Sequence, residues 1–407
     1  MHMTALTDGL PESGIHRRRT LIVTLLVVLS GCAPAFDSAE APSTSVSPLA
    51  STSTSAADTA FPTAKFADIR EDAVSEEASA EFQAILTEGA GGGGMTATVM
   101  TANGSWSGAV GSADGTREMR PEDQLAIGSI TKSVIAAQVM RLAEAGKLAL
   151  DDAAANHLPA DFEFDTNQAT IRQLLGMRSG IPDYVDALWD SLSTDRQHHW
   201  TPAEMLKLVD LDRTPPDGTY NYSSTNYVLL GLIIEHVTGE PLARVLRKGV
   251  LSSGGLQRLI FQPDEAPTEP MAMPAGESTR ALEMGGGYLP SLAGTTAAWA
   301  AGAMASDSAS VARWWSKLCG GEIVSETSLA EMTTFRDGYG LGLSDDTEPY
   351  ATPVVGHGGL HVGYAARAMC FVDDGFVIVI LTNRGEDSGE EVPNALAIAA
   401  RSIDGDE

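Results

Sequence analysis

Basic residues, cysteines and long apolar runs are all scarce in this sequence. Its 407 residues include 26 Lys and Arg against 54 Asp and Glu, which gives a formal net charge of −28. Such a chain repels phosphate groups, which argues against a nucleic-acid partner. Three cysteines exclude a disulfide-dense miniprotein, and the short apolar runs exclude a multi-span membrane protein. A content of 43% hydrophobic and 20% charged residues is ordinary for a globular protein.

An apolar run near the N-terminus, Leu21–Leu29, follows three consecutive arginines. Its nine residues are too few for a membrane-spanning helix, which needs about 20. A basic segment followed by a short apolar one predicts a signal peptide. The run leads into Ser30-Gly31-Cys32, which resembles the lipobox of bacterial lipoproteins, where the cysteine is lipid-modified and becomes the new N-terminus.

We therefore expect a signal peptide over 1–31 and an extracytoplasmic protein held at the plasma membrane of a bacterium through a lipidated Cys32. A plain secretory signal with an incidental cysteine is the alternative. Ser, Thr, Ala and Pro dominate the next residues, so we expect 32–63 to be a disordered tether. One two-lobed globular domain is predicted over 64–407.

Apolar and alternating segments near both ends of this domain predict strands. They are 95–100, 106–110, 354–355, 364–372 and 376–382. Helical spacing instead marks 68–87, 130–145, 170–177, 202–210, 225–237, 297–318 and 392–402. We predict an α/β (α+β) fold in which one antiparallel sheet, built from both chain ends and flanked by helices, carries an inserted all-helical lobe at about 150–290.

Ser129 and Lys132 are the first candidates for chemistry. They lie at the start of the apolar helix predicted over 130–145, and a spacing of nearly one helical turn places them on one face. A serine hydroxyl is a poor nucleophile without an adjacent base. Burial disfavours the charged form of a lysine, which makes it a better base. On its own, the S-x-x-K spacing also fits a capping serine beside a surface lysine.

Two later segments add to this pair. Tyr222 precedes the helix predicted over 225–237, and a tyrosine near a lysine can act as a general acid or base. His357-Gly358-Gly359 follows a strand-like stretch, and glycines there permit a ligand to approach the backbone closely. Each segment also has a plainer interpretation, as a core tyrosine and as a glycine-rich turn.

The order of these motifs resembles the penicillin-recognising serine hydrolases. S-x-x-K stands within Leu125–Lys132, the tyrosine motif within Tyr222–Tyr227, and His-x-Gly within Gly356–Gly359. Leu174–Tyr184 and Tyr339–Gly342 match further stretches typical of the family. The resemblance points to the branch with DD-carboxypeptidases, class C β-lactamases, D-aminopeptidases and related esterases. It implies a β-lactamase/transpeptidase-like fold.

The resemblance also implies roles. Ser129 would be the acylated nucleophile, and Lys132 and Tyr222 would move its proton, protonate the leaving group and activate the hydrolytic water. The backbone amides of Ser129 and Leu360, beside Gly359, would form the oxyanion hole. No cofactor or metal is implied.

Two further side chains receive roles from the resemblance. His357 would support the tyrosine electrostatically and help hold a substrate carboxylate. Trp299 would wall the pocket, with a core tryptophan as the alternative interpretation.

Two departures from the family pattern bear on substrate choice. Ser224 stands where the second motif usually ends in Asn, and it is shorter and donates only one hydrogen bond. Asp345 and Asp346 follow the segment after which carboxypeptidase-like relatives often carry a basic residue. These acids would repel a terminal carboxylate. Both departures weaken the prediction of efficient D-alanyl-D-alanine or penicillin turnover.

Cys319 and Cys370 remain once Cys32 is assigned to lipid. Exported thiols often pair, so we predict a disulfide between them, with two buried free thiols as the alternative.

The sequence thus predicts a cell-surface serine hydrolase that acts through an acyl-enzyme on D-amino-acid peptide, amide or ester bonds. The alternatives are a penicillin-binding or cell-wall-peptide sensor with negligible turnover, a carboxylesterase of the same fold, and a structural surface lipoprotein with a retired site. The expected partners are a small molecule or cell-wall peptide and the membrane, and a monomer is favoured.

Overall fold

A computed structural model describes residues 61–185, 187–188, 195–210, 218–268, 271–275, 291–350, 352–385 and 391–404. The predicted signal peptide, Cys32 and nearly all of the predicted tether lie outside these residues. The Phe61 ring, just before the predicted boundary of the globular domain, stacks on the buried Phe66 ring at 6.0 Å. No helix in this part is both long enough and apolar enough to span a membrane.

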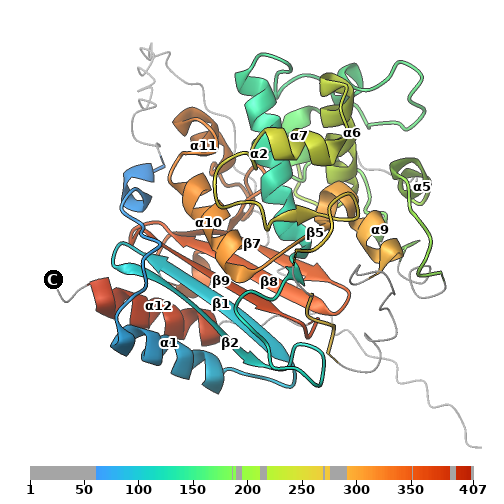
Figure 1. Ribbon diagram of the computed structural model, residues 1–407. Helices are drawn as coiled ribbons and strands as arrows, with labels where there is room; N and C mark the ends of the chain where they lie inside the picture. Colours follow the sequence, from blue (N-terminus) through green and yellow to red (C-terminus); the bar gives the residue numbers. More distant parts are fainter. Residues whose placement is uncertain are drawn as a thin grey trace, which may run out of the picture. The chain divides into compact units, whose positions relative to one another are not determined.

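A six-stranded antiparallel sheet forms the larger layer, as predicted (Figure 1). In spatial order its strands are β2 (Gly104–Gly111), β1 (Gly94–Thr101), β9 (Phe376–Thr382), β8 (Tyr364–Phe371), β7 (Val354–His361) and β6 (Ser344–Asp345). The first strands of the chain pair with the last, since Met95 of β1 lies opposite Thr382 of β9. Apolar residues fill the central strands because both faces of the sheet are covered.

Two helices from opposite ends of the domain cover one face of this sheet. They are α1 (Glu76–Glu88) and α12 (Glu391–Asp404), and they lie side by side under β1 and β2 (Figure 1). The helix predicted over 68–87 begins only at Glu76, because the Ser75 side chain accepts a hydrogen bond from the Ala78 N–H and caps it. Phe82 and Leu396 are among the fully buried residues that join these helices to the sheet.

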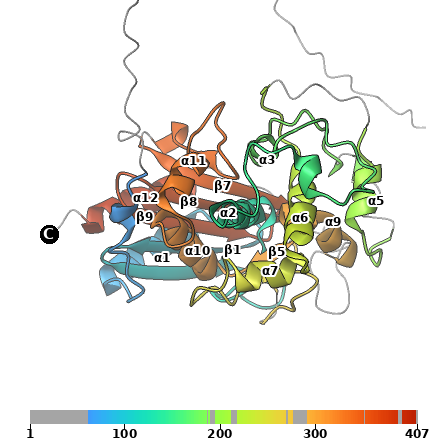
Figure 2. The same ribbon diagram turned by 90° about the horizontal axis from the view of Figure 1, so that it is seen from above.

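The other face carries α10 (Ser308–Cys319), α2 (Thr131–Glu144) and the helical lobe (Figure 2). The lobe contains η4 (Ala154–His157), α3 (Ile171–Leu175), α5 (Pro202–Lys207), α6 (Thr225–Thr238) and α7 (Leu242–Lys248). It is not purely helical, since β4 (Ile260–Phe261) belongs to a small second sheet with β3 (Leu125–Ala126) and β5 (Met304–Ser306). Residues of α2 from Thr131 to Met140 are all buried between the sheet and the lobe.

The single helix predicted over 297–318 is wrong. The chain instead forms α9 (Leu292–Gly302), then β5, then α10. The break begins at Trp299, which has a φ of 31°. Met304–Ser306 then pair with β3 and β4, and Asp307 caps α10 by accepting a hydrogen bond from the Ser310 N–H at 2.7 Å.

The predicted disulfide is present. Cys319 at the end of α10 is bonded to Cys370 on β8, and both residues are buried. The bridge ties the helix to the middle of the main sheet.

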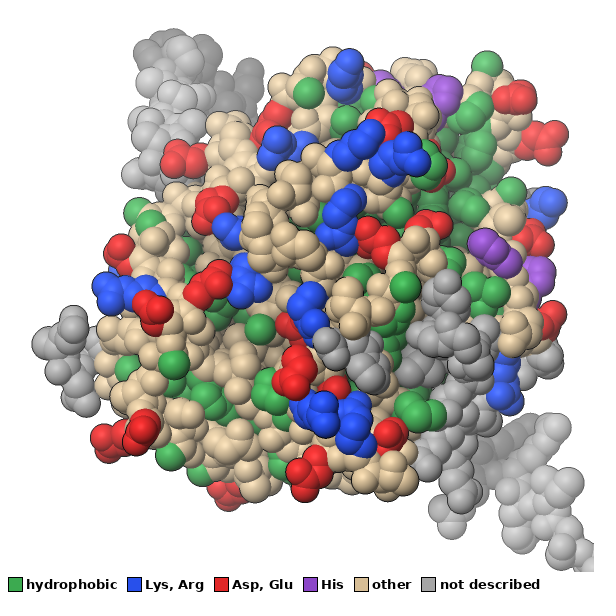
Figure 3. Space-filling model, in the orientation of Figure 1, with side chains coloured by type: hydrophobic (Ala, Val, Ile, Leu, Met, Phe, Trp, Pro, Cys, Tyr) green, Lys and Arg blue, Asp and Glu red, His purple; other side chains and the backbone are tan. Residues whose placement is uncertain are grey.

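Charged side chains of both signs cover the surface together. On the face seen in Figure 3, basic residues lie among acidic ones. Ion pairs such as Arg313 with Glu71 at 2.7 Å and Arg401 with Asp374 at 2.8 Å join distant parts of the chain.

Candidate active site

Ser129 lies in a tight turn directly before α2. The turn is the 3₁₀ helix η3 (Gly128–Ile130), and Gly128 has a φ of +51°, a conformation that favours glycine. A β-carbon at Gly128 would lie 2.6 Å from the Leu360 carbonyl oxygen. The turn is therefore packed against β7, which fixes the Ser129 side chain at the junction of sheet and lobe.

Lys132 is buried in the first turn of α2 and reaches Ser129 as the spacing predicts. Its Nζ donates to the Ser129 Oγ at 2.9 Å, to the Ala301 carbonyl at 2.8 Å and to the Ser224 Oγ at 3.5 Å. The side chain is fully buried, and no carboxylate lies within ion-pair distance of it in the described part of the chain. Lys132 is therefore close enough to exchange a proton with the Ser129 hydroxyl.

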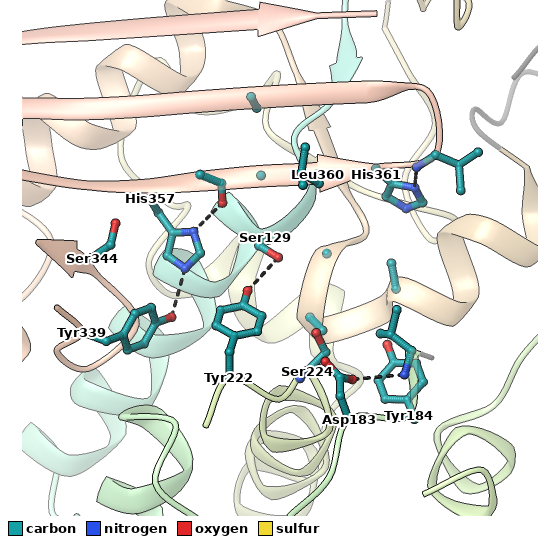
Figure 4. Close-up of a pocket in the computed structure, with 18 of the residues that line it drawn as sticks. Ser129, Asp183, Tyr184, Tyr222, Ser224, Tyr339, Ser344, His357, Leu360 and His361 are labelled. Carbon is teal, nitrogen blue, oxygen red and sulfur yellow. Dashed lines mark hydrogen bonds between the residues drawn. The ribbon is translucent and has the colours of Figure 1, made fainter. Parts of the chain in front are cut away.

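Tyr222 meets the same oxygen from the lobe side. Its hydroxyl donates to the Ser129 Oγ at 2.9 Å (Figure 4), and its ring centroid lies 5.1 Å from the Lys132 Nζ. Two proton-carrying groups therefore converge on one serine oxygen. When either group gives up its proton to solvent or substrate, it can accept the serine proton directly.

His357 occupies β7 next to this centre, but its ring nitrogens are already used. Nδ1 lies 2.5 Å from the Gly358 carbonyl oxygen, and Nε2 lies 3.0 Å from the Tyr339 hydroxyl (Figure 4). A carbonyl oxygen only accepts, so Nδ1 carries the proton. Burial, with a smaller effect of the Lys132 charge, lowers the pKa of His357 to about 4. The imidazole is neutral at pH 7, and Tyr339 donates to Nε2.

This geometry bears on the role that the resemblance implied for His357. A neutral imidazole supplies no positive charge to support Tyr222, and its one N–H is engaged by Gly358. It cannot hold a substrate carboxylate in the way the resemblance implied.

The exposed edge of β7 supplies the predicted oxyanion donor. The Val354 carbonyl accepts from the Asp346 N–H on the β6 side, and the bonding direction alternates along an antiparallel strand. Gly358 and Leu360 therefore direct their backbone groups to that same side. The described β6 pairs only with Val355 and Gly356, so the Leu360 N–H faces the Ser129 turn.

Gly359 permits a close approach between β7 and the Ser129 turn. A β-carbon at position 359 would lie 2.0 Å from the Ile127 carbonyl oxygen and 3.3 Å from the Ser129 nitrogen. The two backbones that carry the oxyanion donors touch at this glycine.

Ser224 lies at the N-terminal end of α6, within reach of Lys132. Its N–H donates to Asp183 Oδ2 at 3.0 Å, and Asp183 Oδ1 accepts from the Val185 N–H at 3.1 Å. The Asp183 carboxylate thus fixes the segment that carries Ser224. The short Ser224 hydroxyl remains close to the proton-transfer groups.

These residues line a pocket of about 620 Å³ between the sheet and the lobe. The residues of α9 that line it are Gly294, Ala297, Ala298, Ala301 and Gly302. Trp299 is not among them, because its ring packs against Gly231 on α6. Trp299 is partly buried and packs against the hydrophobic core.

Three carboxylates stand in the lining of this pocket. Asp183, Asp345 and Asp346 line it, and no Lys or Arg does so among the described residues. His361 also lines the pocket, and burial lowers its pKa to about 4. With both pocket histidines neutral at pH 7, the described lining bears carboxylates and no cation.

A model of the Beta-lactamase family matches residues 76–402. The chain belongs to this family. With its nucleophile and proton-transfer pair assembled, it is a serine hydrolase. Tyr339, His361 and Asp183 are among the pocket residues that the sequence left without a role. Tyr339 and Asp183 stand inside stretches that match the family, and His361 shares the strand face of His357 by simple alternation.

Solved structures of this fold include several amide hydrolases. The chain is similar to a D-stereospecific amidohydrolase from Streptomyces sp., with 27% identity, a TM-score of 0.66, and coverage of 78% of this chain and 98% of that one. A D-amino acid amidase from Ochrobactrum anthropi SV3 has 24% identity, a TM-score of 0.69, and coverage of 80% and 99%, which shows the shared fold.

Curated relatives match over a shorter length. Penicillin-binding protein 4 of Amycolatopsis lactamdurans is 34% identical over 144 residues, which are 34% of this chain and 36% of that protein. Protein flp of Staphylococcus aureus (strain MW2) is 32% identical over 121 residues, 29% of this chain and 24% of that protein. The matches span about a quarter to a third of these relatives.

Proposed function

We propose that this protein hydrolyses amide or ester bonds of D-amino-acid compounds through an acyl-enzyme on Ser129. The observation that carries the proposal is the convergence of Lys132 Nζ and Tyr222 OH on the Ser129 Oγ, each at 2.9 Å. The Leu360 and Ser129 amides add an oxyanion site within the same pocket.

The reaction follows from this arrangement. Ser129 Oγ attacks the substrate carbonyl carbon while its proton passes to Lys132 or Tyr222 in its deprotonated form. The oxyanion forms beside the Leu360 and Ser129 amides. The bond to the leaving nitrogen or oxygen then breaks, and that atom takes up the proton. A water molecule attacks the ester by the reverse path and releases the acid.

The D-configured substrate class rests on similarity. The Streptomyces structure is described as a D-stereospecific amidohydrolase and the Ochrobactrum structure as a D-amino acid amidase. The acidic pocket lining supports an amidase or esterase over a DD-carboxypeptidase, because Asp345 and Asp346 would repel a terminal carboxylate.

A penicillin-binding sensor is the second candidate, and Ser224 is the observation that favours it. A serine at this position donates one hydrogen bond where the family asparagine offers an amide. Slow deacylation would leave the chain acylated by its ligand.

We also propose that the protein works outside the cytoplasm on a lipid anchor at Cys32. The lipobox-like Ser30-Gly31-Cys32 and the Cys319–Cys370 disulfide support this location. If Cys32→Ser leaves the protein in the membrane fraction of the producing cells, the anchor is not this residue.

Labelling of the full chain by a fluorescent fluorophosphonate and a fluorescent penicillin, beside Ser129→Ala, tests the activity. We expect fluorophosphonate labelling of the native chain alone, and release of product from D-phenylalanine p-nitroanilide but not from its L isomer. Stable penicillin labelling without turnover of any amide would support the sensor. An unlabelled native chain would rule out the acyl-enzyme.

A further inference from the structure

Tyr339 and His357 form a pair of buried groups that bears on which leaving groups the site accepts. The Tyr339 hydroxyl lies 3.0 Å from His357 Nε2, and the two rings meet edge to face with centroids 5.7 Å apart. Tyr339 also packs edge to face on the Tyr222 ring at 6.1 Å. Tyr339 therefore contacts both the histidine and the proton-transfer tyrosine.

The proton positions in this pair are determined by the hydrogen bonds. The Gly358 carbonyl requires the proton on Nδ1, so Nε2 of the neutral ring is an acceptor. Burial raises the pKa of the Tyr339 hydroxyl well above its ordinary value, so that hydroxyl keeps its proton and donates it to Nε2. Both ring nitrogens are then satisfied within the protein.

Within the part of the chain that the structure describes, no Lys or Arg lines this wall of the pocket. Lys132 is the nearest positive charge, and its Nζ is held by Ser129 and the Ala301 carbonyl. Arg367 on β8 lies at the register position of Gly358 and so on the opposite face of the sheet. Further titratable groups on this side are Tyr220, Tyr222, Tyr227, Asp345 and Asp346.

We propose that Tyr339 holds His357 as a neutral, Nδ1-protonated imidazole and thereby makes the site select leaving groups that carry no carboxylate. A carboxylate at this wall meets no N–H donor on His357, because both ring nitrogens are engaged within the protein, and it lies near Asp345 in the pocket lining. A leaving group that carries an amide, an ester or an ammonium group in place of the carboxylate is not repelled in this way. Tyr339 acts here as a positioning residue, and the inference rests on the proposed acyl-enzyme hydrolase.

A matched pair of substrates tests the selection. D-Phenylalanyl-D-alanine and D-phenylalanyl-D-alaninamide share the scissile bond and differ only in the charge of the leaving group. We expect the native chain to favour the alaninamide by roughly tenfold or more in kcat/KM at pH 7, because of the nearby carboxylates. The ratio of the two substrates cancels any general loss of activity in a variant.

Three variants differ in the substrate preference that we expect from them. His357→Gln stays uncharged and should keep the preference for the alaninamide, whereas His357→Lys places a cation at this wall and should reduce or reverse it. Asp345→Asn removes one carboxylate from the pocket lining and should raise the ratio of carboxylate-substrate turnover to alaninamide turnover. A native chain that cleaves both substrates equally would overturn the proposal, and so would equal ratios in His357→Gln and His357→Lys.

The proton positions are tested separately. Nitrogen NMR of the histidine-labelled chain, assigned with His357→Gln, should show a protonated Nδ1 and an unprotonated Nε2 at pH 7. Tyr339→Phe should shift the Nε2 signal, which a merely structural contact would leave in place. A protonated Nε2 would refute the assignment.

Fluorophosphonate labelling separates the two possible failures. A chain that is not labelled at Ser129 fails as an acyl-enzyme hydrolase. A chain that is labelled but shows no charge preference fails only in the inference about Tyr339 and His357.

Discussion

An alanine at position 359 would push β7 away from the turn that carries Ser129. A β-carbon built on Gly359 lies 2.0 Å from the Ile127 carbonyl oxygen, whereas ordinary contact begins at 3.4 Å. The two backbones must therefore separate by roughly 1 Å or more. Such a misplacement costs about 100-fold in rate, and the loss of one oxyanion donor costs about 100- to 1,000-fold. We expect Gly359→Ala to lower kcat/KM by about 100-fold or more, or ~2.7 kcal/mol of transition-state stabilisation.

The preceding glycine offers a matched control. A β-carbon on Gly358 has no heavy atom within 4 Å, so Gly358→Ala adds the same methyl group to the same strand without a collision. It should acylate within about threefold of the native rate, the usual range for a substitution that meets open space. Both rates are measured as single-turnover labelling by a fluorophosphonate and as hydrolysis of a p-nitrophenyl ester.

The stability of each variant must be measured alongside the rates, because overpacking lowers the free energy of unfolding by about 1–3 kcal/mol. The assays should therefore run well below the melting temperature of each variant. If folded Gly359→Ala acylates as fast as Gly358→Ala, the contact between β7 and the Ser129 turn does not position the oxyanion site, and the reasoning above is wrong.

Three further predictions concern the proton-transfer pair, the disulfide and the effect of pH. Lys132→Met keeps the length of the side chain but removes its donors, and ester hydrolysis should fall by about 100- to 10,000-fold, with a native rate refuting the role. Replacing Cys319 and Cys370 by alanine opens a loop with a sequence separation of 51 and should cost about 4 kcal/mol in urea unfolding; a loss under about 1 kcal/mol would contradict this. The pKa of His357 is about 4 in the folded chain against 6.5 ordinarily, so the unfolded chain binds the proton first as pH falls. Stability should therefore decline from pH 6.5 to pH 4 by up to about 3 kcal/mol on this account, and His357→Gln should show a smaller decline.

The catalytic centre could be predicted because its signals are local. Ser129 and Lys132 are three residues apart on one turn, so their meeting at 2.9 Å needs no knowledge of the rest of the fold. The strands likewise carry alternation and clear turn residues, and the order of the motifs supplied Tyr222. Each of these features can be recognised from one amino-acid sequence alone.

The features that the sequence missed depend on contacts between distant segments. The residues at 297–318 have helical composition throughout, and only pairing with β3 and β4 pulls Met304–Ser306 into a strand. The charge state of His357 depends on burial and on Tyr339, which comes from another segment. Trp299 is turned toward Gly231 by a backbone angle that its neighbours in sequence do not reveal.

The pairing of β1 with β9 also constrains how the domain can fold. Met95 on β1 pairs with Thr382 on β9. β1 therefore cannot pair with this neighbour until β9, near the C-terminal end of the domain, has been synthesised. Contacts of such long sequence separation form slowly, because closing the intervening loop lowers the chain entropy before the stabilising contacts exist. A nascent chain therefore lacks its central pairing until translation is nearly complete. The domain therefore remains unfolded for most of its synthesis. A translocation channel for unfolded chains requires this state.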